Sequence, residues 1–255
     1  MSIDPIQARP RLSLKDHKSD LINVERRLLL RGGLSLGAVS LLSGCSISDN
    51  EGIERALGAI SRFNDRVQAV LFSGTRLAPT YTAAEITPDF PFNAYYPESK
   101  VRVIDGATWK LALAGRIADK TPWTLDALRT LPQESQITRH ICVEGWSAIG
   151  QWAGVPFRTF LERIGADTKA AYVGFTCGDD YRSSIDMATA LHPQTILALD
   201  YAGAPLPPKY GFPVKLRIPT KLGFKNPKHI MAITVTNDHP GGYWEDQGYN
   251  WFSGS

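Results

Sequence analysis

The stretch from Arg139 to Ser147 reads Arg-His-Ile-Cys-Val-Glu-Gly-Trp-Ser and places a cysteine near the end of a predicted strand. The strand is predicted over residues 136–143, and the glycine that follows favours a turn. Cys142 is therefore expected at the rim of a sheet, and Glu144 would share its face if the strand continued that far. A thiolate there can be a nucleophile or a ligand for a soft metal, although an isolated cysteine in an apolar strand is more often a small core residue.

Outward from this stretch, strand and helix patterns are mixed without a regular alternation. Strands are predicted over 109–114, 171–175, 196–201, 214–218 and 230–235, and short helices over 124–131, 156–164 and 184–191. The sequence contains no glycine-rich phosphate loop. These patterns predict an α+β domain over residues 86–255, with mixed β-sheets and short helices.

The segment before this domain, residues 46–85, is predicted to be a polar tether followed by an amphipathic helix. Apolar residues recur there at spacings of three and four, as on one face of a helix: Ile53, Leu57, Ile60, Phe63, Val67 and Val70. A proline-rich irregular segment follows over residues 78–97. Loops of that length inside a domain are usually functional.

Residues 1–45 are predicted to be an export signal. Arg26 and Arg27 precede leucines and a further arginine, and an uncharged run then extends from Gly32 to Gly44, which resembles a twin-arginine signal. Small residues before Cys45 resemble a lipoprotein-processing box. The alternatives are an amphipathic or buried N-terminal helix and an ordinary cleavage site. Whether Cys45 marks a lipoprotein-processing box or an ordinary cleavage site, this segment is left out of the fold prediction.

The charge of the chain is concentrated at its N-terminus. Residues 1–31 hold seven Lys/Arg against four Asp/Glu, which accounts for the whole net charge of +3. The remaining 21 basic and 21 acidic residues balance, so the body of the protein is neutral. A neutral body gives no electrostatic reason to expect nucleic-acid binding.

The Cys142 stretch resembles the cysteine loop of the sulfite-oxidase superfamily of molybdopterin-dependent oxidoreductases. It is most similar to the branch containing the periplasmic methionine-sulfoxide reductase catalytic subunits. Further segments resemble that branch in the same order, over residues 92–96, 204–216, 221–225 and 241–249. The resemblance therefore implies a sulfite-oxidase-type fold, a Mo-molybdopterin cofactor and Cys142 as the ligand to the metal.

The resemblance also implies a set of site residues. Cys142 and Glu144 are the candidate catalytic residues, with Glu144 a candidate for proton delivery. Trp146, Tyr243 and Tyr249 are candidate pocket walls. His140 either donates a hydrogen bond to a group beside the metal ligand or is a structural histidine. The cofactor-binding candidates are Asn93, Tyr96, Cys142, Cys177, Tyr210, Lys215, Gly223, Phe224 and Lys225.

Three of these candidates depart from the branch, which has threonine, asparagine and arginine where this chain has Cys177, Tyr210 and Lys215. The nearby cations fit an anionic pterin phosphate, with Lys221, Lys225 and Arg217 close to Lys215 in sequence. The alternative is a solvated basic strand edge. Lys225 is expected to lie outside the apolar core.

The predicted function is that of an exported molybdenum-cofactor oxidoreductase. It would transfer an oxygen atom, or catalyse a related two-electron reaction, on a small sulfoxide- or sulfite-like substrate. The sequence has no Cys-x-x-Cys-His haem motif, so electrons must be exchanged with a separate partner, which in the resembling family is a membrane haem protein. The expected location is the periplasm or cell envelope, with a lipid anchor at Cys45 if the processing box is used. The alternative is a non-catalytic lipoprotein that binds a ligand or partner and is stapled by a Cys142–Cys177 disulfide.

Overall fold

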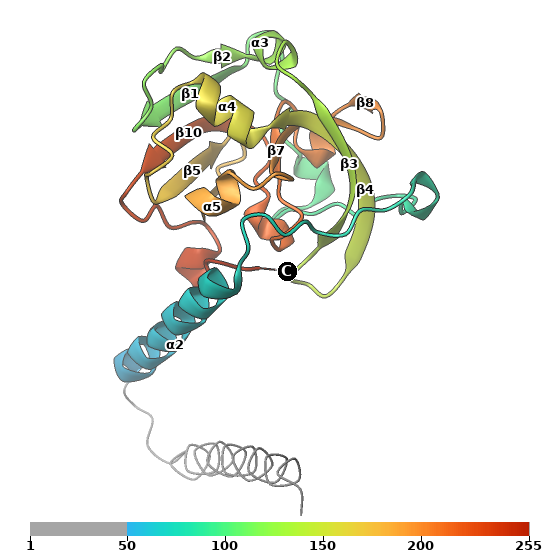
Figure 1. The fold of residues 1–255 in the computed structure, drawn as a ribbon. Coiled ribbons are helices and arrows are strands. Elements are labelled where there is room, and N and C mark those ends of the chain that lie inside the picture. Colours follow the sequence, from blue (N-terminus) through green and yellow to red (C-terminus); the bar gives the residue numbers. More distant parts are fainter. Residues whose placement is uncertain (1–49, 255) are drawn as a thin grey trace, which may run out of the picture. The chain divides into compact units, whose positions relative to one another are not determined.

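Two five-stranded β-sheets form the framework of the computed structural model, which describes residues 50–254 (Figure 1). The first sheet has the order β2 (Trp123–Thr124), β1 (Lys110–Gly115), β10 (Ile230–Thr236), β5 (Tyr172–Cys177) and β6 (Arg182–Asp186). Strands β1 and β10 are parallel, whereas the other neighbours are antiparallel. The first sheet is therefore mixed, as predicted.

The second sheet is antiparallel and carries the Cys142 hairpin. Its order is β3 (Glu134–Ile141), β4 (Ser147–Pro156), β7 (Ile196–Tyr201) and β8 (Ala204–Pro205), and β9 (Lys215–Arg217) also pairs with β7. The helices among the described residues are α2 (Asn50–Leu71), α3 (Leu125–Arg129), α4 (Phe157–Arg163) and α5 (Met187–Ala190). Short 3-10 turns include η4 (Gly223–Lys225) and η5 (Glu245–Gln247). This arrangement confirms the α+β prediction.

Strand β7 lies at the centre of the packing because both of its faces are buried. Leu197 and Leu199 face the main core, which also takes side chains from the first sheet and from α4. Ile196 and Ala198 face a second cluster built around Phe90, Trp152 and Tyr210. Burying one large apolar side chain contributes roughly 1.5–3 kcal/mol. The continuous apolar run of β7 is therefore what this two-sided position requires.

Strand β4 was not predicted, because its glycines interrupt the strand pattern. A Cβ built on Gly154 would lie 2.0 Å from the carbonyl oxygen of Leu197, so only glycine lets β7 approach this closely. The pairing of β4 with β7 shifts register at this glycine. The residue that weakens the strand pattern is the one that makes the strand contact possible.

The helix predicted over residues 184–191 is wrong in its first half. Ser184 and Ile185 belong to β6, which pairs with β5. The side chain of Asp186 then accepts a hydrogen bond from the backbone N–H of Thr189, at 2.8 Å, and so begins the one-turn helix α5. Pairing within the sheet therefore overrides the local helical preference.

The amphipathic helix predicted before the domain is confirmed as α2, whose C-terminal half contacts the end of the chain. Asp65 accepts a hydrogen bond from the backbone N–H of Phe252 at 2.7 Å, and Gln68 accepts one from Gly254 at 3.1 Å. Among the described residues, no helix is both long and apolar enough to cross a membrane. The predicted export signal and processing box fall on residues 1–45, outside the described residues.

Candidate active site

Cys142 lies in the tight turn that joins β3 to β4. Strand β3 ends at Ile141, so the predicted strand runs two residues too far. The backbone N–H of Cys142 donates to the carbonyl oxygen of Trp146 at 2.9 Å, and Gly145 adopts a positive φ of 92° that closes the turn. The turn brings a carboxylate oxygen of Glu144 to 3.6 Å from Cys142 Sγ. The two residues therefore come together through the turn and not along a strand.

The Cys142 thiol opens into a pocket built from segments far apart in the sequence. Asn93 Nδ2 donates to Cys142 Sγ at 3.3 Å, so the irregular segment 78–97 does reach the site. Six of the predicted site residues line the pocket: Asn93, Cys142, Glu144, Gly223, Phe224 and Tyr249. The remaining lining comes from Ala94, Tyr95, Val143, Asp179, Tyr181, Asn226, Pro227, Lys228 and Trp244.

Two predicted wall residues lie behind the pocket surface. The Trp146 indole N–H donates to the Glu144 carboxylate at 2.9 Å, so this tryptophan orients Glu144 and does not itself line the pocket. The ring of Tyr243 packs on Tyr95, with 4.5 Å between centroids. Both residues therefore act on the pocket through a neighbour that lines it.

Five predicted cofactor residues also lie outside the pocket lining: Tyr96, Cys177, Tyr210, Lys215 and Lys225. Tyr96 donates to a carboxylate oxygen of Asp179 at 2.8 Å, and through that residue it is connected to the pocket. Cys177 is buried at the end of β5. Tyr210 donates to the carbonyl oxygen of Phe90 at 2.7 Å and belongs to the second core cluster. The structure thus joins Tyr96 to the site more closely than Tyr210.

The inner cationic cluster comprises His140, Lys215, Arg217 and Lys228, all buried. Each of the other three lowers the pKa of His140, although burial lowers it most. Burial likewise lowers the pKa of Lys215 far below its usual value, that of Arg217 to about 9 and that of Lys228 to about 8. No carboxylate among residues 50–254 forms an ion pair with any of the four. The alternative of a solvated basic edge is therefore wrong for these residues.

The inner cationic cluster also holds polar atoms without partners. Both ring nitrogens of His140 and the Nε of Arg217 are buried and have no hydrogen-bond partner within residues 50–254. A Cβ on Gly223 would lie 2.5 Å from His140 Nε2, so this glycine lets the backbone of η4 lie directly against the histidine. Buried polar groups are nearly always paired in native proteins. The cluster therefore has unused hydrogen-bonding capacity beside the pocket.

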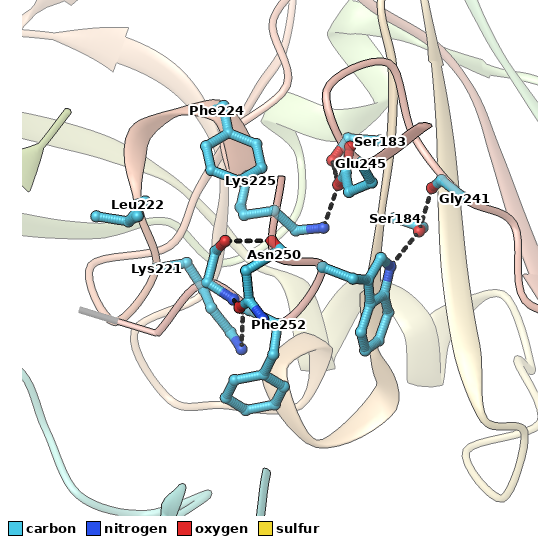
Figure 2. Close-up of polar contacts among 12 residues, drawn as sticks. Ser183, Ser184, Lys221, Leu222, Phe224, Lys225, Gly241, Glu245, Asn250 and Phe252 are labelled. Atoms are coloured by element: carbon cyan, nitrogen blue, oxygen red, sulfur yellow. Dashed lines mark hydrogen bonds and ion pairs between the residues drawn. The ribbon is translucent and has the colours of Figure 1, made fainter. Parts of the chain in front are cut away.

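Lys221 and Lys225, the tail-side cations, are also buried but are paired within the chain (Figure 2). Lys221 Nζ donates to the carbonyl oxygen of Phe252 at 2.8 Å. Lys225 Nζ forms a close ion pair with Glu245, which is buried with it. The prediction that Lys225 lies outside the core is wrong, because η4 turns its side chain under the C-terminal segment.

Several pocket residues were not predicted from the sequence, notably Asp179, Tyr181, Asn226 and Lys228. Asp179 follows β5 and Lys228 precedes β10, and these two strands are paired at Cys177 and Ile230. The residues meet because neighbouring strand ends meet. Without the strand pairing, their spacing along the chain carries no recognisable signal.

Both described thiols, Cys142 and Cys177, are free. The alternative of a Cys142–Cys177 disulfide is therefore wrong. Burial raises the pKa of Cys142 above its usual value, partly opposed by the backbone N–H of Glu144. Binding a metal would deprotonate this thiol, because the thiolate is the ligand form.

The donor set fits a metal carried on an anionic cofactor. No group of three or more His, Cys, Asp and Glu side chains among residues 50–254 could hold a metal ion. A metal at Cys142 would therefore take most of its ligands from a source other than side chains. The unpaired cations and orphaned nitrogens of the inner cationic cluster offer the charge and donors that a pterin phosphate needs.

Comparisons with known proteins agree with this fit. Residues 98–244 match the family described as the oxidoreductase molybdopterin binding domain. The chain is 62% identical over 230 residues to the putative protein-methionine-sulfoxide reductase subunit YedZ1 of Azospira oryzae, across 90% of this chain and 88% of that protein. It is 31% identical over 198 residues to the protein-methionine-sulfoxide reductase catalytic subunit MsrP of Xanthomonas axonopodis pv. citri, across 68% of this chain and 61% of that protein.

Among solved structures, the sulfane dehydrogenase SoxCD from Paracoccus pantotrophus has a similar fold, with a TM-score of 0.51 and 15% sequence identity over 54% of this chain and 40% of that one. At that identity the likeness concerns the fold alone. Sequence family, fold and donor set converge. The chain belongs to the molybdopterin-binding oxidoreductases of the sulfite-oxidase superfamily and is a molybdopterin-dependent enzyme.

Proposed function

We propose that this enzyme reduces sulfoxides, with methionine sulfoxide in peptides and proteins as its substrate class. The observation that carries the proposal is the Cys142 pocket, with its thiol, its nearby carboxylate and its aromatic wall, in a chain similar to proteins named methionine-sulfoxide reductase subunits. The balanced reaction consumes one sulfoxide, two electrons and two protons. It yields one thioether and one water.

The chain's contribution is to hold the cofactor and shape the site. When bound, Mo-molybdopterin supplies two-electron redox chemistry and accepts or donates an oxygen atom. Cys142 is the proposed metal ligand. The inner cationic cluster and Gly223 are proposed to bind the pterin, together with Asn93, Tyr96, Phe224 and Cys177. A role for Tyr210 in cofactor binding is supported by the resemblance alone, because its hydroxyl already donates a hydrogen bond to the carbonyl oxygen of Phe90.

Glu144 is the proposed route for protons. Its carboxylate lies 3.6 Å from Cys142 Sγ, is held by the Trp146 indole and is exposed at the mouth of the pocket. A carboxylate that touches both solvent and the reacting position can pass protons between them. Trp146 is the positioning residue for this step, since its N–H fixes one carboxylate oxygen.

The aromatic wall supports a thioether-like substrate. The pocket is lined by Tyr95, Tyr181, Phe224, Trp244 and Tyr249; Tyr95 stacks on Tyr181, and Tyr249 packs edge to face on Phe224 and tilted on Trp244. Sulfur atoms pack favourably against aromatic rings, and an apolar wall suits the methyl group and methylenes of methionine. A doubly charged oxyanion such as sulfite gains less from such a wall.

Electrons are proposed to come from a separate partner of the membrane haem protein class. The word subunit in the names of the relatives agrees with a partner. Export through the twin-arginine route, to the periplasm or cell envelope, stays a proposal based on residues 1–45. So does an anchor at Cys45.

Steady-state turnover tests the proposal. Cofactor-loaded protein, with a reduced viologen dye as electron donor, should reduce a methionine-sulfoxide peptide, and Cys142→Ser should abolish turnover while the chain stays folded. The Cys142 variant should also lose molybdenum, which is expected near one equivalent in the parent, because a hydroxyl is a hard and mostly protonated ligand. Faster oxidation of sulfite than reduction of the peptide would contradict the proposed substrate class. Full turnover by Cys142→Ser would contradict the proposed ligand.

A further inference from the structure

Helix α2 carries an apolar stripe that nothing in the described chain covers. Its large apolar side chains are well exposed, with Phe63 63% and Val70 83% accessible; the stripe consists of Leu57, Ile60, Phe63, Val67, Val70 and Leu71. Exposed apolar surface of this extent normally marks an interaction site. Since these residues recur every three or four positions, they form one continuous face of the helix.

The stripe lies on a different side of α2 from the side that contacts the domain. The domain contacts are made by Asp65, Gln68 and Phe72, of which Phe72 packs edge to face on Phe252 with 5.6 Å between ring centroids. At 100° per residue these three positions point well away from Ile60 and Val67, the centre of the stripe. Of the stripe, Leu71 lines the cavity between the helix and Arg139 and Phe252. Among the described residues, the rest of the stripe stays exposed while the helix is held by its other side.

The shape and charge of the stripe fit a phospholipid surface. Residues 57–71 span roughly 21 Å at a rise of 1.5 Å per residue, which is far longer than a small ligand. Arg62 and Arg66 are exposed on the same helix, where their guanidinium groups could reach lipid phosphates while the stripe enters the acyl boundary. Because Arg62, Asp65 and Arg66 lie within this stretch, burying the whole helix in hydrocarbon would be costly.

The sequence before α2 favours a lipid surface over a second copy of the chain. Asn50, the first residue of α2, is five positions after Cys45, which itself follows the uncharged run from Gly32 to Gly44. Cleavage before Cys45 would remove that run but would leave α2 five residues from the predicted lipid anchor, which favours a lipid surface. We infer that α2 lies flat on a phospholipid bilayer through this stripe. The inference does not depend on the substrate or on acylation of Cys45.

Fluorescence quenching on vesicles tests the inference directly. The protein without its predicted export signal, beginning at residue 45 and carrying Cys45→Ser to prevent acylation, is loaded with cofactor and mixed with phosphatidylethanolamine and phosphatidylglycerol vesicles that contain brominated acyl chains. An added tryptophan in Phe63→Trp should be quenched relative to the parent protein. The matched control Val103→Trp, at a domain position 84% exposed, should not be. Absence of quenching at position 63 would overturn the inference.

Partitioning provides a second, independent measurement. Phe63→Asp combined with Val70→Asp should weaken flotation with vesicles by at least about tenfold, since two large apolar side chains no longer enter the lipid. Val103→Asp should float like the parent, and all three proteins should reduce the sulfoxide peptide equally in the absence of lipid. Unchanged flotation of the double variant would overturn the inference. A second outcome would also overturn it: the parent forms a dimer, the double variant does not, and lipid quenches neither protein. The stripe would then bind a second copy of the chain.

Discussion

Two groups of buried basic residues, all but His140 within residues 215–228, have different surroundings. The tail-side cations Lys221 and Lys225 are held by the C-terminal segment, through the carbonyl oxygen of Phe252 and the carboxylate of Glu245. The inner cationic cluster has no carboxylate at ion-pair distance among the described residues, and Lys215 meets only the ring of Trp152, at 5.1 Å. A buried charge without a counter-charge is costly. The inner cationic cluster is therefore the group that awaits an external anion.

This difference changes the expected role of Lys225. The resemblance assigns it to the pterin phosphate, but its ammonium already has a buried carboxylate partner. A phosphate would have to compete with Glu245 or share Lys225 with it. Within residues 50–254, Lys215 has no carboxylate partner, and Lys228 forms no ion pair with Asp179 or Glu98, although both raise its pKa, so these two lysines should contribute more of the affinity for the cofactor.

The largest effect is expected from Lys225→Met, which should lower the free energy of unfolding of the cofactor-free protein by about 3–5 kcal/mol. Removing one partner of a buried ion pair leaves the other charge uncompensated, here on Glu245. Urea unfolding measures the change. The double variant Lys225→Met with Glu245→Leu should recover most of the loss, and Lys169→Met, in an exposed turn, should unfold like the parent.

The same variants separate folding from cofactor binding. If Lys225 competes for a phosphate, Glu245→Gln should tighten cofactor binding, because the ammonium is released from its carboxylate. Weaker binding by Glu245→Gln would show that Glu245 positions Lys225 for the cofactor. In that case the contrast between the two groups would fail.

A smaller effect, of the opposite kind, is expected from Lys215→Met. Loss of one charge-assisted hydrogen bond of about 1.5–3 kcal/mol should weaken cofactor affinity by roughly 10- to 150-fold. The cofactor-free protein should become more stable, because a buried and unpaired charge is removed. Titration of apo-protein with the cofactor measures the first change, and urea unfolding the second. An unchanged affinity would place the phosphate away from the inner cationic cluster.

The sequence predicted those elements whose burial follows a simple pattern along the chain. The run over residues 196–199 is apolar because both faces of β7 are buried there, so the strand Ile196–Tyr201 was recognised with its boundaries. Strand β4 was missed because Gly154 is needed for close contact with β7, a requirement set by a strand more than 40 residues away. Patterns along the chain cannot show a contact of that kind.

The candidate site divides in the same way. Cys142, Glu144 and Asn93 were found because each lies in a contiguous motif, and the structure brings the three together. Asp179 and Lys228 were missed because only the pairing of β5 with β10 unites them. The cluster of lysines near residue 220 predicted an anion-binding site. They could not reveal that Glu245, twenty residues beyond Lys225, neutralises part of that charge.

The smallest effect is a pH dependence that distinguishes the two groups. Burial lowers the pKa of Lys221 to about 7, against the pull of Asp186, and that of Lys228 to about 8, whereas the unfolded value is about 10.4. Between the folded and unfolded pKa values the unfolded chain binds more protons. The contribution of each lysine to stability therefore rises with pH across that window, by at most about 1.4 kcal/mol per pH unit, and is lost as pH falls to the folded pKa.

Comparing the parent with Lys221→Met and with Lys228→Met, by urea unfolding at pH 7, 8 and 9, isolates each contribution. In cofactor-free protein, the free energy of unfolding of the parent minus that of each variant should increase with pH. The same difference for Lys120→Met, an exposed control, should stay constant. In loaded protein the Lys228 difference should become flat, because a bound anion favours the charged ammonium and returns its pKa towards the unfolded value. The Lys221 difference should persist, because Phe252 and Asp186 still surround that lysine. If both differences became flat on loading, the cofactor would reach the tail-side cations as well, and the two groups would form a single anion site.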